Sequence, residues 1–458
     1  MDSRRSVMDL LSVGFGASVL MWAVGFFCRI PLGEMGEEAA VAPPTTELAA
    51  AGPVPAPWLF AILLACMLGC GLAAGRWTRR GWMGGIWAGT VCAALNLLIV
   101  LGAVGGEAPN SLAPSAALFL PGSVLAGALL GAAGAAMGSR LRAAAWRPGQ
   151  TAACAEPDWP QVFTLVAAAA TFLLILVGGL VTSFRAGLHV PDWPNSFGYL
   201  MFFYPLSKMS GGIYFEHSHR LLGTLVGLTT LVLAIHALRT EDRRWVRRLA
   251  LAALALVVLQ GVLGGLRVTG RLTLSAARTD MAPSIALAVA HGVVGQVFFC
   301  VLAAWSAFRS RAWRQPPVVP APNRGTDWKF QAGLVVLLLG QLAAGAMLRH
   351  TRQMLHLHLA LAALALCAAA VVAARTIGLY SHSPILARLA KVLLGLVVAQ
   401  LVLGGLAMYV LGFVLERRPM ALLQVISTCV HQTTAVLLLG AATLLAVWSR
   451  RLLGPPDT

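Results

Sequence analysis

The sequence predicts an all-α integral membrane protein with about twelve transmembrane helices. Of its 458 residues, 58% are hydrophobic and only 11% are charged, whereas an average soluble domain carries about 25% charged residues. Apolar runs of about 20 residues recur along the chain, and each is long enough to cross the hydrocarbon core of a bilayer as a helix. Backbone polar groups in lipid must be satisfied within the segment, which favours helices for these runs.

The expected helices are the apolar runs themselves, with ends placed to within a few residues. In chain order they span residues 7–27, 57–75, 82–104, 114–137, 160–183, 215–238, 249–268, 285–308, 329–348, 354–375, 390–412 and 421–446.

The net charge of +17 is distributed in a way that indicates a membrane topology rather than a nucleic-acid partner. Lys and Arg cluster in alternate loops, and the positive-inside rule assigns those loops to the cytoplasm. The opposite loops are poorer in Lys and Arg, and the first of them is acidic, with Glu34, Glu37, Glu38 and Glu47. We therefore expect a multi-pass protein of the cell's inner (cytoplasmic) membrane, embedded in lipid, with both termini cytoplasmic and no nucleic-acid partner.

The eight cysteines lie mostly inside expected helices, and no two of them share an outer loop. The sequence therefore predicts no disulfide framework. Cys66 and Cys70 are four residues apart and share one face of a helix. A redox pair is one interpretation, but two small residues in a helical core is the one we expect.

A basic, proline-containing stretch over residues 139–160 divides the chain. The four helices before it, in residues 1–140, are rich in Ala, Gly and Leu and contain no histidine. All ten histidines follow it. Any metal or heme chemistry is therefore expected after the dividing stretch, and the amino-terminal segment has no assigned role.

The histidine-containing part repeats itself at an offset of 140 residues. Gln260, Gly264 and His291 recur as Gln400, Gly404 and His431, and in both copies the histidine follows the glycine at an offset of 27. This pattern predicts two tandem four-helix bundles, residues 160–308 and 329–446, related by an internal repeat. Both halves would begin in the same orientation, an arrangement that transporters also use.

Four histidines stand out because ionisable groups inside a membrane segment are costly and usually functional. His219, His291, His356 and His431 each lie in the outer half of a different expected helix. Two per bundle is the number that bis-histidine ligation of one heme requires. Interfacial or hydrogen-bonded core histidines are the alternative for any one of them taken alone.

A charged motif opens the helix that carries His219. Glu216 precedes His219 by three residues and therefore shares its helix face, and Arg220 follows directly. A carboxylate in the first turn is also what the helix dipole favours, so a helix-start role is the alternative for Glu216. His217 points away from His219 on the same helix.

Around these residues the sequence resembles the heme A synthase family. The carrying motifs are Gly-Gly-Leu-Val-Thr at residues 178–182, Gly-Leu-x-x-Pro-Asp-Trp-Pro at 187–194 and Glu-x-x-His-Arg at 216–220. Gln-x-x-His at 353–356 and His-Gln at 431–432 resemble the second half of the family. The resemblance covers about residues 160–446 and leaves the first four helices outside.

The resemblance implies oxidation of a methyl group of heme O to the formyl group of heme A, for cytochrome oxidase assembly. By this likeness, His219 and His291 would face the substrate heme, and His356 and His431 would ligate a resident heme b near the outer membrane face. Glu216 would be the catalytic carboxylate, and Arg220 would bind a heme propionate. Heme O synthase and assembly factors of cytochrome oxidase would be partners.

Three choices stay open at this stage. His358 competes with His356 for the ligand role, and only one of the two can face the bundle core because they lie about 200° apart around a helix. A diheme b-type membrane cytochrome that only transfers electrons would explain the four histidines but would give Glu216 no task. A transporter would explain the parallel repeat.

Overall fold

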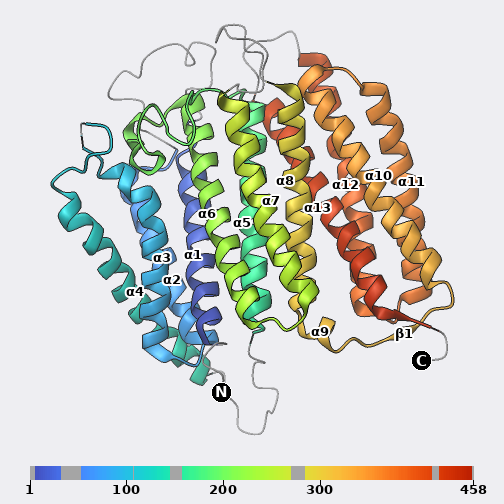
Figure 1. Cartoon of the computed structure of the whole chain (residues 1–458), viewed down its shortest axis with the longest axis horizontal. Coiled ribbons are helices and arrows are strands. Elements are labelled where there is room, and N and C mark those ends of the chain that lie inside the picture. Colours follow the sequence, from blue (N-terminus) through green and yellow to red (C-terminus); the bar gives the residue numbers. More distant parts are fainter. Residues whose placement is uncertain are drawn as a thin grey trace. The chain divides into compact units, whose positions relative to one another are not determined.

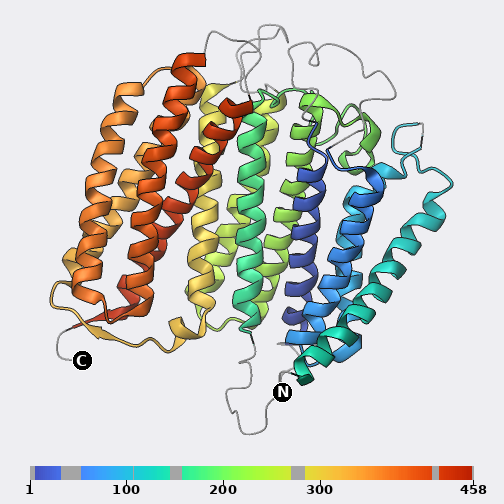
Figure 2. The same ribbon diagram turned by 180° about the vertical axis from the view of Figure 1, so that it is seen from behind.

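The computed structural model describes residues 6–31, 53–106, 108–144, 157–269, 284–414 and 422–455. The chain divides into two compact units, Met1–Asp242 and Arg243–Thr458. Figures 1 and 2 show the helices from opposite sides, coloured along the sequence. The acidic residues predicted in the first outer loop (Glu34, Glu37, Glu38 and Glu47) lie outside the described residues.

In the part of the chain that the structure describes, twelve helices are long and apolar enough to cross a membrane, which confirms the predicted fold class. The first unit contains α1 (Ser6–Cys28), α2 (Ala56–Trp77), α3 (Gly81–Ala103), α4 (Ala116–Ala144), α5 (Trp159–Ser183) and α6 (Gly211–Thr240). The second contains α7 (Arg244–Thr269), α8 (Ile285–Arg309), α10 (Arg324–Thr351), α11 (Leu355–Tyr380), α12 (Pro384–Val414) and α13 (Leu422–Leu452). The protein is therefore an integral multi-pass membrane protein.

Short elements complete the described chain. A four-residue helix, α9 (Arg311–Arg314), follows α8, and two 3-10 turns, η3 (Met201–Phe203) and η4 (Leu206–Lys208), lie between α5 and α6. The strands β1 (Val319–Pro320) and β2 (Leu453–Gly454) pair in parallel at the ends of the second unit's helices. The division into bundles 160–308 and 329–446 stays a prediction.

Glycine allows α2, α3 and α4 of the first unit to pack backbone against backbone. A Cβ atom at Gly71 of α2 or at Gly85 of α3 would collide with the carbonyl of Gly131 in α4. Small residues at intervals of four permit such close approach in membranes, where van der Waals packing rather than water exclusion drives helix association. The many small residues that the sequence places in this segment therefore serve helix packing.

Helix α1 connects these glycine-rich helices to α5 and α6. The Ser12 hydroxyl donates to the carbonyl of Trp159 at 3.2 Å, and the Phe15 and Phe163 rings meet edge to face at 5.3 Å. Farther along, Tyr214 of α6 donates its hydroxyl to the carbonyl of Phe26 at 2.6 Å. The first four helices and the pair α5–α6 thus share one core.

The second unit is built from the neighbouring pairs α7–α8, α10–α11 and α12–α13, with α8 and α13 also in contact. A short turn joins α10 to α11, with Arg352 and Met354 in left-handed conformations at φ 58° and 70°. At the other end of the same pair, buried Asp327 accepts hydrogen bonds from Arg375 (2.7 Å) and from Tyr380. This polar network holds α10 against α11, the helix that carries His356 and His358.

Candidate functional site

Four histidines share one local arrangement, in which the ring lies against a glycine of the preceding helix. A Cβ atom at Gly178, Gly345 or Gly404 would lie 2.9–3.0 Å from Cε1 of His219, His358 or His431 respectively. At Gly264 the same atom would lie 3.4 Å from Cε1 of His291. We call each of these pairs a glycine–histidine cradle. The glycine leaves room for an imidazole between two helices, and a larger side chain would displace the ring.

In three of the four cradles a glutamine four residues before the glycine approaches the ring. Nε2 of Gln341 lies 3.5 Å from Nε2 of His358, and Nε2 of Gln400 lies 3.3 Å from Nε2 of His431. The side-chain amide of Gln260 has partners for both its nitrogen and its oxygen when the two are exchanged. In that orientation the nitrogen donates to Nδ1 of His291 at 2.9 Å. Each glutamine thus engages one ring nitrogen of its histidine.

His358 and His431 lie opposite each other in the second unit. Their ring centroids are 6.5 Å apart and the ring planes are inclined by 78°. His356, which the Gln-x-x-His spacing had favoured as the ligand, is exposed, whereas His358 is half-buried in its cradle. Because residues two apart project to different sides of a helix, the geometry favours His358 over His356 as the partner of His431.

The His358–His431 pair fits a heme iron. Metal–imidazole bonds of about 2 Å place two rings on opposite sides of one ion with their centres about 6 Å apart. In addition, Nδ1 of each ring is buried and, among the described residues, has no hydrogen-bond partner. The described residues hold no group of three or more His, Cys, Asp or Glu side chains suited to a metal ion. Two axial imidazoles are the protein ligands that a heme takes, because the porphyrin supplies the rest.

The cradle of His219 in the first unit differs from the other three. Leu174 occupies the position four residues before Gly178, where the other cradles have glutamine. Instead, the charged pair Glu216 and Arg220 lies on the same helix, within one turn on either side of His219. His291 belongs to the second unit, so the predicted pairing of His219 with His291 stays a prediction.

Glu216 and Arg220 hold the loop between α5 and α6. Glu216 is buried, and its carboxylate accepts from Arg220 at 2.8 Å and from the backbone N–H of Val190 at 2.9 Å. The Arg220 guanidinium donates further to the carbonyls of Asp192 (2.6 Å), Asn195 (2.9 Å) and Val190 (2.8 Å). The sequence had suggested a propionate partner for Arg220; in the structure the loop carbonyls and Glu216 take its donors.

The remaining loop contacts show how the Pro-Asp-Trp-Pro loop (residues 191–194) is joined to the Glu-x-x-His-Arg motif (residues 216–220). The Asp192 carboxylate accepts from the backbone N–H groups of Phe197 (2.7 Å) and Gly198 (2.8 Å). The Ser196 hydroxyl lies 3.1 Å from Nδ1 of His217, which is buried and faces the loop. The two motifs therefore form one unit of structure, which we call the loop clamp (residues 187–198 with Glu216, His217 and Arg220).

Tyr204 packs behind the loop clamp. Its ring lies 5.0 Å from that of His217. Burial, together with the neighbouring Tyr199, raises the pKa of the Tyr204 hydroxyl to about 12. The hydroxyl therefore stays protonated at neutral pH and donates to the carbonyl of Lys208 at 3.4 Å.

The amino-terminal helices also hold this loop. The backbone N–H of Leu200 donates to Oδ1 of Asn110 at 2.6 Å, and Gly102 of α3 lies so close to the carbonyl of Tyr204 that a Cβ atom would be 2.6 Å from its oxygen. The Phe26 and Tyr214 rings stack at 5.4 Å. Contacts from α1, α3 and the segment before α4 thus position the loop and the start of α6.

Basic side chains gather in the second unit near the ends of α7 and α10. Arg267 and Arg349 both lie close enough to His350 to act on its charge. Arg349 immediately precedes His350 and follows Gly345 by four residues, so it lies about one helical turn from the cradle of His358. Guanidinium groups in such a place suit carboxylates, including those of a heme.

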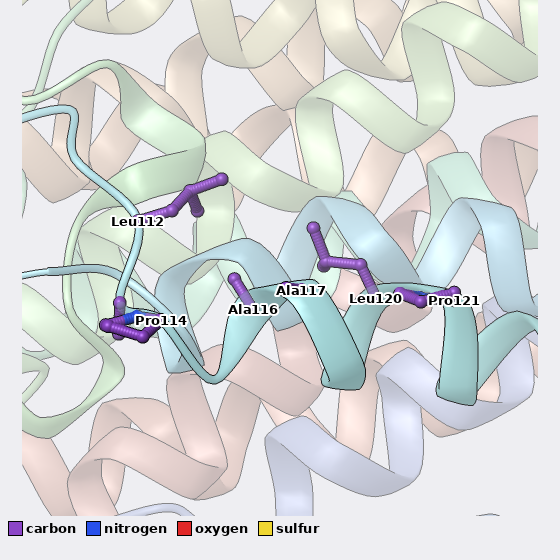
Figure 3. Close-up of a pocket in the computed structure, with 7 residues that line it drawn as sticks. Leu112, Pro114, Ala116, Ala117, Leu120 and Pro121 are labelled. Carbon is purple, nitrogen blue, oxygen red and sulfur yellow. The ribbon is translucent and has the colours of Figure 1, made fainter.

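A separate apolar pocket lies at the start of α4 and carries no reactive group among its lining residues. Leu112, Leu120 and Pro121 are among the side chains that line it (Figure 3). We assign it no part in the chemistry.

Sequence reasoning missed the glutamines as partners of the histidines, although the signal was present. Gln-x-x-x-Gly occurs at residues 260–264, 341–345 and 400–404, which places each glutamine one turn before a cradle glycine. The repeat had drawn attention to the first and third of these but not to Gln341. Including Gln341 would have pointed to the helix pair α10–α11, although not to His358 rather than His356, because α11 carries both histidines.

Comparison with known proteins agrees with the resemblance in the sequence. Residues 161–357 match the model of a protein family described as cytochrome oxidase assembly protein. The chain is also 28% identical over 207 residues to a heme A synthase from Beijerinckia indica subsp. indica. That alignment covers 40% of this chain and 55% of the relative, so the chain spans about half the relative's length. Residues 1–160 lie outside the matched range, whereas residues 161–357 are similar to the cytochrome oxidase assembly protein family, and part of the chain is similar to a heme A synthase.

Proposed function

We propose that the protein is a heme A synthase that oxidises a methyl group of heme O to the formyl group of heme A. The observation that carries this proposal is the difference between its cradles: a facing histidine pair in the second unit and a charged loop clamp beside His219 in the first. A protein that only stores or carries heme needs the first arrangement but not the second. The similarity of residues 161–357 to the cytochrome oxidase assembly protein family supports the same conclusion.

His358 and His431 are the proposed ligands of a resident heme b, with His358 in the place first given to His356. Their facing rings and their unpartnered Nδ1 atoms support this choice. When bound, the heme supplies one-electron redox chemistry. Gln341 and Gln400 would orient the two rings, since a half-turn of either amide lets its oxygen accept the N–H of the non-ligating nitrogen.

His219 and His291 are the proposed histidines on the substrate side, and Glu216 is the proposed catalytic carboxylate. Oxidation of a methyl group removes hydrogen, so protons must leave the reacting edge of the substrate. The Glu216 carboxylate is held between Arg220 and the Val190 N–H and lies one turn from His219, which suits it to accept such protons. Arg220 would act by positioning Glu216 and the loop.

The proposed location is the cell's inner (cytoplasmic) membrane, with both termini cytoplasmic and the heme sites toward the outer face. The positive-inside distribution of Lys and Arg supports this orientation.

Heme O is the proposed substrate, and heme O synthase and cytochrome oxidase assembly factors are the proposed partners. Arg349, near His350 in the second unit, is the proposed partner of a heme propionate in place of Arg220.

Pigment analysis of the purified full-length protein tests the proposal. The protein should be expressed with and without a heme O synthase, and its hemes extracted and separated by chromatography. We expect heme b in both preparations and heme A only with co-expression. Heme b in both without any heme A would support the diheme cytochrome instead, and a protein without heme absorbance would support a transporter.

A further inference from the structure

The amino-terminal helices contain a buried cluster of three sulfur atoms that the proposed heme chemistry does not use. The thiols of Cys70 in α2 and Cys92 in α3 are close enough to interact, and the Cys70 thiol donates to the carbonyl of Val13 at 3.9 Å. Sγ of Cys92 lies 3.5 Å from Sδ of Met21 in α1. All three side chains are buried, and Cys92 is 0% exposed. Three helices thus bring two thiols and a thioether to one point in the core.

An asparagine is directed at these sulfur atoms and is itself held in place. Nδ2 of Asn96 donates to Sδ of Met21 at 3.2 Å and lies 3.5 Å from Sγ of Cys92. Its Oδ1 accepts from the indole N–H of Trp22 at 2.8 Å, which fixes the orientation of the amide. A donor directed at a cysteine sulfur stabilises the thiolate, and partners of this kind orient metal ligands in many sites.

We propose that Met21, Cys70 and Cys92 form a binding site for a soft monovalent metal ion, copper(I). Thiolate and thioether ligands select copper(I), and a thioether is foreign to the usual structural zinc sites, which use cysteine and histidine. Metal–sulfur bonds of about 2.3 Å require ligand sulfur atoms about 4 Å apart in a three-coordinate site. The 3.5 Å between Cys92 and Met21 is close to that separation.

Charge balance in the apolar core favours the same ion. Binding forms copper–sulfur bonds to the three side chains and breaks the S–H bond of Cys92, whose proton leaves to solvent; copper stays copper(I) and no electron is transferred. One thiolate and one monovalent cation leave the site neutral, which a low-dielectric interior requires. Asn96 would stabilise the thiolate, and Cys70 would bind as a thiol.

Copper(I) titration of the full-length protein under reducing, oxygen-free conditions tests this site. The metal is delivered from a chromophoric copper(I) chelator, and the copper retained by the protein is measured with its X-ray absorption spectrum. We expect stoichiometric copper with sulfur neighbours at about 2.3 Å. Cys92→Ser should abolish retention, and Met21→Leu, a volume-conserving change, should weaken it by about 10- to 100-fold.

Matched variants separate the site from a general effect of thiols or of folding. Met67→Leu changes another buried methionine of the same helices, and Cys300→Ser changes a buried cysteine of the second unit; both should retain copper as the unchanged protein does. Size-exclusion profiles report whether each variant is folded. Absence of retained copper in the unchanged protein, a nitrogen-dominated spectrum, or equal retention by Met21→Leu would overturn the proposal. None of these readouts depends on heme A formation.

Discussion

The histidine cradle of the first unit and those of the second share a glycine but differ in what surrounds the ring. His358 and His431 each have a glutamine within 3.5 Å and face each other. His219 has Leu174 where a glutamine would be, and a buried ion pair on its own helix. The same glycine–histidine arrangement therefore has different neighbouring side chains in the two units.

The difference teaches how one scaffold can serve two tasks. Rings fixed by glutamine and opposed across a short gap are suited to hold a resident group without movement. A ring beside Glu216, with a loop folded over the ion pair, is suited to a site where a substrate enters and protons leave. Within the described part of the first unit, the amino-terminal segment contacts the loop between α5 and α6 and the start of α6, through Asn110, Gly102 and Phe26.

The largest effect is expected from removing a facing ring. His358→Ala and His431→Ala should each abolish binding of the resident heme b, because a single remaining imidazole cannot provide both axial ligands. His356→Ala, on the exposed side of the same helix, is the matched control and should keep its heme. The heme-to-protein ratio of purified variants is the measurement. Loss of heme from His356→Ala with retention in His358→Ala would reverse the assignment.

The next largest effect is expected at the loop clamp. Arg220→Ala leaves Glu216 buried without its cation and three loop carbonyls without their donor, and breaking a buried pair in this way costs about 3–5 kcal/mol. We expect the loop of residues 187–198 to become sensitive to limited proteolysis while resident heme content is unchanged. A loop in Arg220→Ala that resists protease as well as the unchanged protein would contradict the clamp.

Removing a glutamine should have a moderate effect. Gln400→Leu deletes the partner of the His431 ring, and loss of such a partner lowers metal affinity by about 10- to 100-fold. Heme retention during dilution should fall in Gln400→Leu, and Leu174→Gln should leave it unchanged because that position belongs to the other cradle. Equal heme retention by Gln400→Leu and the unchanged protein would remove the distinction between the cradles.

The smallest effect is expected from filling the cradles. Gly345→Ala places a Cβ atom 2.9 Å from the His358 ring, so the ring must shift, at a cost of about 1 kcal/mol. Gly264→Ala has 3.4 Å to the His291 ring and should cost less. Thermal unfolding monitored by heme absorbance should rank the two variants in that order. The reverse order would show that the cradles are not rigid.

The sequence predicted the fold well because the signals that define it are local. Apolar run length identifies a membrane helix without knowledge of its neighbours, and all twelve expected ranges overlap helices of the described chain. The choice between His356 and His358 was harder, because both lie on one helix and differ only in which side faces α13. That depends on the rotation of α11, which a residue spacing does not determine.

The role of Arg220 shows a second limit of sequence reasoning. The family resemblance suggested that Arg220 binds a heme propionate, whereas in the structure its donors go to the carbonyls of Asp192, Asn195 and Val190. These carbonyls are backbone groups of a loop, and their positions depend on how residues 187–198 fold back on α6. Every residue has a backbone carbonyl, so a sequence pattern does not indicate which carbonyls accept from Arg220. The loop clamp could therefore be identified only from the structure.

The most direct test of the division between a resident-heme pair and a reactive clamp is heme analysis of Glu216→Gln with heme O synthase co-expressed. This variant keeps the size of the side chain and an acceptor for the Val190 N–H but removes the group that takes up protons. We predict an unchanged ratio of heme b to protein and a fall in heme A formation by about 100-fold or more. Normal heme A yield from Glu216→Gln would contradict the account.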